Sequence, residues 1–254
     1  MAEILSTPND REIFEIGYSN ESKESSEKSK DAEAKFYEAI KKLSALEQRE
    51  KRRGSRLNVA EIGAEAGKTF VRYIASRQDD PKLIQGVCNE IRSLLPTQKA
   101  EEFISGFLTE YAVAFVLTEE LGKEVYYSDD SRDEDTIQKI DWVVKEPDED
   151  SEIYLQVKTL PLIEDPEQSQ KLVFKIESQS DLRSMANNLY TYKYKGQPSV
   201  GHYMQKAEEM FKANSSNDAK LVFFFVPSEQ INPYSGTFAN KDFILNLDEA
   251  FSEI

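Results

Sequence analysis

The chain has 254 residues, a net charge of −15 and a hydrophobic fraction of 39%, which suits one medium domain with an extension, or two small domains. The negative charge argues against a strong, sequence-blind nucleic-acid binder, because such binding comes largely from Lys and Arg that neutralise phosphates. It does not exclude a local basic groove. No apolar run approaches the roughly 20 residues that a membrane-spanning helix needs, so we expect no membrane partner.

The cysteine count and the N-terminus indicate a cytoplasmic protein. Cys88 is the only cysteine, which excludes an intramolecular disulfide and a cysteine-based zinc site. The first residues, MAEILSTPNDREIFE, are acidic and contain no apolar segment of the kind found in a signal peptide. The chain contains neither a G-x-G-x-x-G motif nor a P-loop, so nucleotide hydrolysis and dinucleotide chemistry have no support.

The first part of the chain is predicted to be a polar end followed by helices. Residues 1–30 are rich in Ser, Glu, Lys and Asn, and we expect them to be disordered or frayed. Residues 31–96 place apolar side chains at helical spacing in three stretches, 31–53, 58–77 and 80–96. We therefore expect a helical region over 31–96 that forms a small bundle or an arm.

Residues 97–254 are predicted to form an α/β core. Residues 97–122 favour one long helix, with Thr97 as an N-cap candidate and Gly122 at its end. Short strands are expected at 123–128, 138–146 and 152–160, with 171–177 as a further candidate. A helix is expected around 199–214, and the apolar run 219–228 is typical of a strand buried on both faces. The predicted order is helix, three strands, helix, strand.

Glu110 lies on the apolar side of the predicted helix 97–122. At about 100° per residue, it shares a sector with Phe103 and Phe107, roughly opposite the polar side chains. Burial of an ionised carboxylate is costly unless the group is paired or binds a metal. A salt bridge with a nearby Lys or Arg and a metal ligand are both open at this point.

Three further polar residues lie within predicted strands. Asp141 interrupts the apolar run of 138–146, where a strand-end Asp at a bulge would be an ordinary explanation. Gln156 and Lys158 are two residues apart, so they share one face of the strand 152–160. The solvent face of an edge strand would explain that pair equally well.

Together these residues could supply each role that phosphodiester hydrolysis requires. A divalent cation needs hard oxygen ligands, which the Asp141 carboxylate, the Gln156 amide and the Val157 carbonyl could provide. Glu110 could hold the cation directly or through water. Lys158 could orient the attacking water or stabilise the transition state.

Asp141, fourteen intervening residues and then Gln156-Val157-Lys158, behind a helix that carries Glu110, resemble the motif of the PD-(D/E)xK superfamily. These are the restriction-endonuclease-like and Holliday-junction-resolvase-like nucleases. The resemblance covers about 97–228, including the element order, and does not cover the N-terminal helices. It implies a restriction-endonuclease-like core, with Glu110, Asp141, Gln156 and Lys158 as catalytic residues.

The chain departs from the usual motif at Gln156, where the superfamily ordinarily has an acidic residue. A glutamine there resembles the Mrr-type branch, in which Q-x-K is the usual form. An amide brings no charge to a cation, so the substitution bears on how tightly a metal binds. Ile140, where the usual motif has Pro, is a second and minor departure.

Substrate contacts are predicted outside the motif. Basic and aromatic side chains alternate in TYKYKG, residues 191–196, a pattern that suits phosphate contact combined with base stacking, although a solvated loop would look the same. His202, the only histidine, and Gln205 lie on the predicted helix 199–214. The substrate-contact candidates are therefore Lys193, Tyr194, Lys195, His202 and Gln205.

The sequence thus predicts a Mg²⁺- or Mn²⁺-dependent DNA endonuclease acting in restriction, phage defence or repair. Glu110, Asp141, Gln156 and Val157 are the expected metal ligands. DNA is expected in preference to RNA, and a homodimer would be natural for double-strand cleavage. The alternative is a catalytically inactive protein of the nuclease fold that binds nucleic acid or another protein.

Overall fold

The computed structural model describes residues 14, 23–53, 59–77, 82–127, 140–145, 152–160, 173–191, 208, 220–240 and 244. The chain divides into two compact units. The sheet unit comprises Met1–Phe14, Val116–Gln230 and Asn240–Ile254, and the helical unit comprises Glu15–Phe115 and Ile231–Ala239. None of the described helices combines the length and the apolar character that crossing a bilayer requires.

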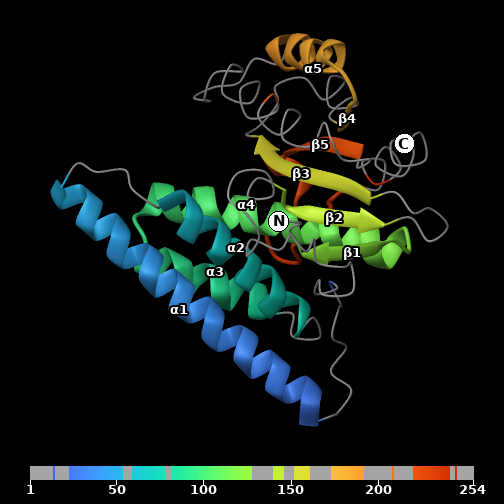
Figure 1. Cartoon of the computed structure of the whole chain (residues 1–254). Helices are drawn as coiled ribbons and strands as arrows, with labels where there is room; N and C mark the ends of the chain where they lie inside the picture. Colours follow the sequence, from blue (N-terminus) through green and yellow to red (C-terminus); the bar gives the residue numbers. More distant parts are fainter. Residues whose placement is uncertain are drawn as a thin grey trace, which may run out of the picture. The chain divides into compact units, whose positions relative to one another are not determined.

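The helical unit is built from α1 (Lys23–Arg53), α2 (Val59–Ala75), α3 (Leu83–Leu94) and α4 (Thr97–Phe115). The long α1 packs against α2 and α3, and α4 also packs against α2 and α3 (Figure 1). Most of the side chains that helical spacing placed on the apolar faces are buried there: Phe36, Ile40, Leu43, Phe70, Val71, Ile74, Ile84, Val87 and Ile91. Leu46, Ile62 and Leu94 are only half-buried. The helix α1 begins at Lys23 rather than near residue 31, because its Glu- and Lys-rich first turns favour helix even without a core to cover.

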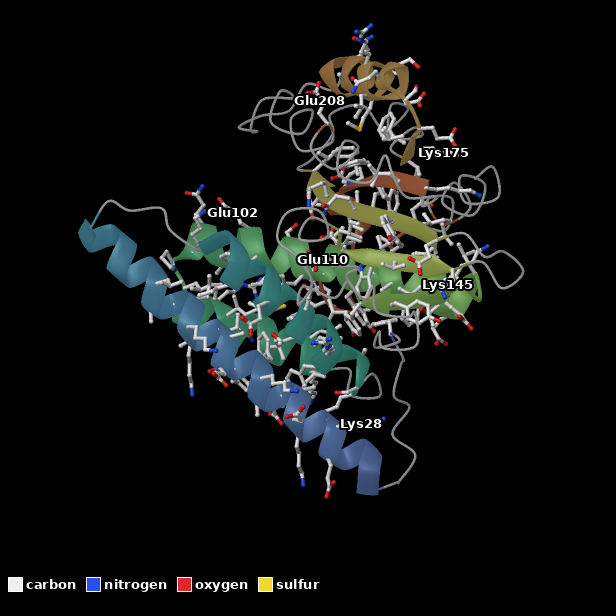
Figure 2. The ribbon with its side chains drawn as sticks, viewed as in Figure 1. Lys28, Glu102, Glu110, Lys145, Lys175 and Glu208 are labelled. Atoms are coloured by element: carbon white, nitrogen blue, oxygen red, sulfur yellow. The ribbon has the colours of Figure 1, made fainter. Side chains whose placement is uncertain are left out.

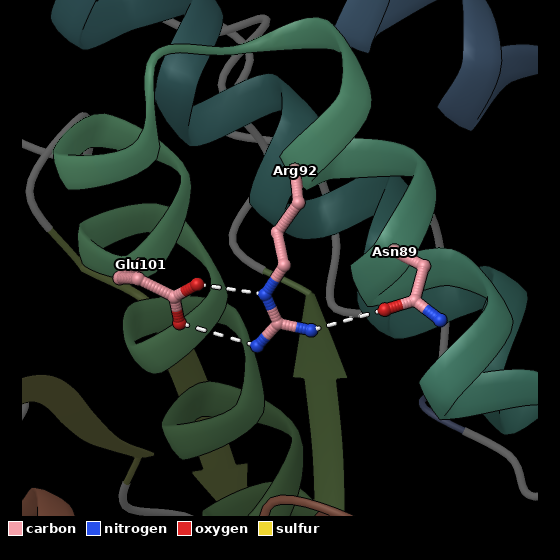
Figure 3. Close-up of polar contacts among 3 residues, drawn as sticks. All are labelled: Asn89, Arg92 and Glu101. Carbon is pink, nitrogen blue, oxygen red and sulfur yellow. Dashed lines mark hydrogen bonds and ion pairs between the residues drawn. The ribbon is translucent and has the colours of Figure 1, made fainter.

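A bidentate ion pair links α3 to the start of α4 (Figure 3). Arg92 donates from Nε to Glu101 Oε1 at 2.7 Å and from Nη2 to Glu101 Oε2 at 3.2 Å, and its Nη1 donates to Asn89 Oδ1 at 3.3 Å. Hydrogen bonding to Arg92 lowers the pKa of Glu101. Because both side chains are largely exposed, the pair contributes at most about 1 kcal/mol.

The expected helix 97–122 is present, but its last part is a π-helical turn, η2 (Val116–Glu120), which follows α4 directly. Leu121 N–H donates to Val116 O at 3.0 Å, and Lys123 N–H donates to Leu117 O at 2.8 Å. Gly122 has φ = 64°, the left-handed conformation that glycine adopts readily at a helix end. The predicted glycine stop is therefore confirmed, and the boundary between the units coincides with the change from α- to π-helix.

The sheet unit contains β1 (Glu124–Tyr127), β2 (Trp142–Lys145), β3 (Glu152–Leu160), β4 (Val173–Ile176) and β5 (Lys220–Pro227), with α5 (Gln179–Thr191) between β4 and β5. The order in the sheet is β1-β2-β3-β5-β4 (Figure 1). The β3–β5 pair is parallel and the other three pairs are antiparallel. The chain is thus a mixed α/β protein, as predicted.

The strands β3 and β5 lie in the interior of the sheet, with a strand on either side of each. The apolar run of β5 is almost entirely buried and has β3 on one side and β4 on the other, which confirms the prediction of a strand buried on both faces. The strand β3 lies between β2 and β5. The edge-strand explanation of Gln156 and Lys158 is therefore wrong.

The strand candidate at 171–177 is present as β4, and α5, which the sequence did not predict, follows it. The predicted helix at 199–214 lies outside the described residues apart from Glu208, which is helical. A capping box starts α5: Asp181 N–H donates to Ser178 Oγ, and Asp181 Oδ2 accepts from Glu177 N–H at 3.0 Å and from the Ser178 hydroxyl at 2.8 Å.

Candidate active site

Asp141 occupies the point where β2 begins. The strand starts at Trp142, which pairs with Leu155 of β3, and Asp141 forms a bend just before it. Asp141 N–H still donates to Leu155 O, at 3.0 Å. The strand β2 does not extend back past Trp142. The Asp141 side chain, rather than a strand backbone, therefore lies beside the peptide groups of β3 that follow Leu155.

The carboxylate of Asp141 replaces the missing backbone acceptor. Val157 N–H donates to Asp141 Oδ2 at 2.7 Å, and Gln156 Nε2 donates to the same oxygen. Lys158 Nζ lies 3.8 Å from that oxygen. A peptide N–H, a carboxamide and an ammonium group from three consecutive residues of β3 therefore converge on one carboxylate oxygen.

Burial differs along this group of residues. Gln156 is only 3% exposed, whereas the side chains of Asp141 and Lys158 are 20% and 26% exposed. A carboxylate with so little access to water requires compensation by charge or hydrogen bonds, and the three donors supply both. Lys158 retains enough exposure to reach a ligand from solvent.

Gln156 Nε2 also lies 3.4 Å from Val157 O, a long contact with a second acceptor oxygen. Because a carboxylate and a peptide carbonyl accept hydrogen bonds and do not donate them, the amide group faces both oxygens with its NH₂. The orientation of the Gln156 carboxamide is thus determined by its neighbours.

Glu110 belongs to α4 of the helical unit (Figure 2). It is half-buried, and its Oε2 lies 3.2 Å from the position that a Cβ atom on Gly67 of α2 would occupy. The same Gly67 position would lie 3.0 Å from the Phe107 ring, so Glu110 and Phe107 share the face of α4 that packs on α2, as helical periodicity predicted. The structure places Glu110 relative to α2, and its assignment as a metal ligand stays a sequence-based prediction.

The structure therefore brings together Asp141, Gln156, Val157 and Lys158 within the sheet unit. The five substrate-contact candidates, Lys193, Tyr194, Lys195, His202 and Gln205, lie outside the described residues. Among the residues that are described, no group of three or more His, Cys, Asp or Glu side chains is arranged to hold a metal ion. The groups that meet at this point of the sheet unit are one carboxylate, one carboxamide and one peptide carbonyl, whose oxygen atoms are hard donors of the kind that Mg²⁺ or Mn²⁺ prefers.

An aromatic cluster that the sequence did not predict supports the start of β2. Trp142 is 2% exposed, and its ring contacts Phe14 (centroids 5.4 Å apart, planes at 71°) and Tyr127 (5.0 Å, 46°). Phe14 is 1% exposed, and its N–H donates to Val125 O of β1 at 2.7 Å. The expectation that residues 1–30 are disordered or frayed is therefore wrong at Phe14, because a side chain of this size gains enough from burial to hold its place in the sheet unit. It is also wrong over 23–30, which belong to α1.

Comparisons with models of protein families, with curated proteins and with solved structures found no match. No relative therefore contributes a residue role.

Proposed function

We propose that the sheet unit carries the catalytic centre of a metal-dependent nuclease that hydrolyses phosphodiester bonds, with DNA as the expected substrate. The observation that carries this proposal is the meeting of Asp141, Gln156 and Lys158 at one carboxylate oxygen, beside a peptide carbonyl. These are three of the four catalytic residues that the PD-(D/E)xK resemblance implies, and the fourth is Glu110. A restriction-endonuclease-like core is the fold that we propose for these strands.

Each residue would have a separate chemical role. The oxygens of Asp141, Gln156 and Val157 would hold Mg²⁺ or Mn²⁺, which when bound acidifies a water molecule and offsets charge on the phosphate. Lys158, partly exposed on the same face of β3 as Gln156, would orient the attacking water or stabilise the negative charge that develops on the phosphate oxygens.

A cleavage assay with single- and double-stranded DNA and RNA, in Mg²⁺ and in Mn²⁺, tests the proposal. We expect Lys158→Ala to lower the rate by about 10²–10³-fold, the usual cost of removing one group that stabilises the transition state. Asp141→Asn, which keeps an acceptor for Val157 N–H, should abolish cleavage with the fold retained. Glu110→Gln tests the remaining predicted ligand in the same assay.

Lys175→Ala is the matched control for Lys158→Ala. Lys175 lies on β4 (Figure 2), where it pairs with Glu177 at 3.1 Å, so its loss removes a partly exposed lysine from the same sheet without touching Asp141. Cleavage that survives Asp141→Asn and Lys158→Ala, or a wild-type protein that cleaves none of the substrates in either metal, would contradict the proposal.

The alternative is a non-catalytic protein of the same fold, and one observation favours it. Asp141 Oδ2 already accepts hydrogen bonds from Gln156 Nε2 and Val157 N–H and lies 3.8 Å from Lys158 Nζ, so the carboxylate has a structural role at the start of β2 without any cation. Calorimetric titration with Mn²⁺ separates the two candidates. Binding that is lost in Asp141→Asn supports the catalytic centre, and absence of binding supports the alternative.

A further inference from the structure

The NH₂ group of Gln156 occupies the space between two oxygens, Asp141 Oδ2 and Val157 O. These are two of the three oxygens that we assign to a cation in the proposed function. The third is Oε1 of Gln156 itself, which is bonded to the same carbon as Nε2. In this orientation the NH₂ group, the positive end of the amide, faces the two oxygens. To share a cation with them, the amide would have to present Oε1, its negative end.

We propose that the Gln156 carboxamide acts as a built-in substitute for the cation, an inference that rests on the metal site of the proposed function. With no cation bound, the NH₂ group compensates Asp141 and Val157. A half-turn about the terminal side-chain torsion exchanges Nε2 for Oε1, and the group that filled the position becomes a ligand. That torsion joins sp³ and sp² carbons and has a broad, roughly two-fold profile, so the exchange needs no change in the backbone of β3.

A glutamate at this position could not make the exchange. Its carboxylate has no donor when ionised, so it would place a second negative group beside Asp141 at a site where the residue is 3% exposed. We infer that glutamine allows the sheet unit to fold without metal, at the expense of metal affinity, because each binding event must first break the bond between the amide and the Asp141 carboxylate.

This inference separates Gln156 from an ordinary buried amide that completes a strand end. An ordinary amide keeps its orientation whether or not metal is present, and a carboxylate in its place destabilises the protein under all conditions. The proposed exchange instead makes the effect of a carboxylate depend on the cation. The sign of the Mn²⁺ effect on stability is therefore the informative measurement.

The experiment compares thermal unfolding midpoints and Mn²⁺ affinities of the full chain for wild type, Gln156→Glu, Gln156→Met and the control Gln85→Glu. Gln85 is exposed on α3, so the control adds the same charge away from Asp141. In EDTA we expect Gln156→Glu to unfold about 4–8 °C below wild type, and Mn²⁺ to restore the midpoint. Its Mn²⁺ affinity should exceed that of wild type by about tenfold to a hundredfold.

Gln156→Met removes both the donor and the ligand oxygen at similar volume. We expect it to unfold below wild type in EDTA and to regain nothing in Mn²⁺. A Gln156→Glu protein with the wild-type midpoint in EDTA, or one that Mn²⁺ does not restore, would overturn the inference. Gln85→Glu should match wild type in both conditions.

A measurement on the wild-type protein covers the case in which the variants do not fold. The side-chain amide resonance of Gln156, identified by its loss in Gln156→Met or by sequential assignment, should shift strongly during a Mg²⁺ titration. A resonance that does not move at saturating Mg²⁺ overturns the exchange.

The inference and the proposed function fail in different ways. Mn²⁺-dependent rescue of Gln156→Glu without any cleavage activity would support the cation position and contradict the nuclease. Cleavage that requires Asp141, combined with a Gln156 resonance that ignores Mg²⁺, would support the nuclease and overturn the exchange.

Discussion

Replacing Phe14 with alanine should loosen the aromatic cluster at the start of β2. Phe14 is 1% exposed and makes edge-to-face contacts with Tyr127 (centroids 5.9 Å, 66°) and with Trp142 (5.4 Å, 71°). Trp142 is the residue after Asp141, so the Phe14 ring buttresses the start of β2. The variant thus tests whether Phe14 contributes to the structure that positions the carboxylate.

The size of the effect follows from the burial of the ring. Truncation of a fully buried Phe to Ala costs about 3–5 kcal/mol, and we expect the lower end for two reasons. A terminal segment can relax into the space that the ring leaves. In addition, nothing among the described residues accepts a hydrogen bond from the buried Trp142 Nε1, and water that enters would provide one. A loss of about 3 kcal/mol corresponds to a midpoint lower by about 6–12 °C.

Trp142 is the only tryptophan of the chain, so its fluorescence reports on this one location. We expect the emission of Phe14→Ala to shift to longer wavelength as water reaches the indole, with the lower unfolding midpoint measured on the same sample. Tyr234→Ala is the control, because Tyr234 is 65% exposed and its loss should change stability by less than about 0.5 kcal/mol. Wild-type emission and midpoint in Phe14→Ala would refute the anchor.

Two further predictions concern α5 and α3. Asp181→Ala should cost about 1 kcal/mol by removing the capping box of α5, measured by urea unfolding, whereas Ser184→Ala on the exposed side of the same helix should cost nothing. The hydrogen bond from Ser178 lowers the pKa of Asp181. The stabilising contribution of Asp181 is therefore present above the unfolded pKa of about 3.9 and is lost as the pH falls through the lower folded value. A stability difference between wild type and Asp181→Ala that persists at low pH would contradict this. Cys88 should resist thiol reagents at pH 8, since burial raises its pKa to about 11. Unfolding in guanidinium should release one reactive thiol. Rapid labelling of the native protein would contradict this and would show that α3 opens.

Local patterns predicted most of the elements. The alternation of β3 and the continuous apolar run of β5 indicated one strand with a polar pair and one strand in the middle of a sheet, and both are present. The side of α4 that carries Glu110 also followed from periodicity, because helix geometry alone decides which residues share a face. These are properties of ten or twenty neighbouring residues.

What the sequence did not predict depends on partners far along the chain or on a short polar signal. Phe14 has partners at Tyr127 and Trp142, more than a hundred residues away, and no local pattern distinguishes it from a solvent-exposed aromatic residue. The start of α5 carries only a short signal, Ser178 and Asp181 at capping-box spacing, with Leu182, Met185 and Ala186 following at helical spacing. The donor arrangement around Asp141 was likewise beyond prediction, because it depends on the register between β2 and β3.

That register has a consequence for how the gene can change. Hydrogen bonds from Asp141 N–H to Leu155 O and from Val157 N–H to Asp141 Oδ2 bracket Gln156 on both sides. Insertions or deletions of residues between β2 and β3 leave these two hydrogen bonds intact as long as Trp142 still pairs with Leu155. A single codon lost within β3 ahead of Gln156 exchanges the polar pair for apolar side chains, since alternate residues of a strand point to opposite faces. Length variation among descendants of this gene should therefore be found between Lys145 and Glu152 and not within β3 ahead of Gln156.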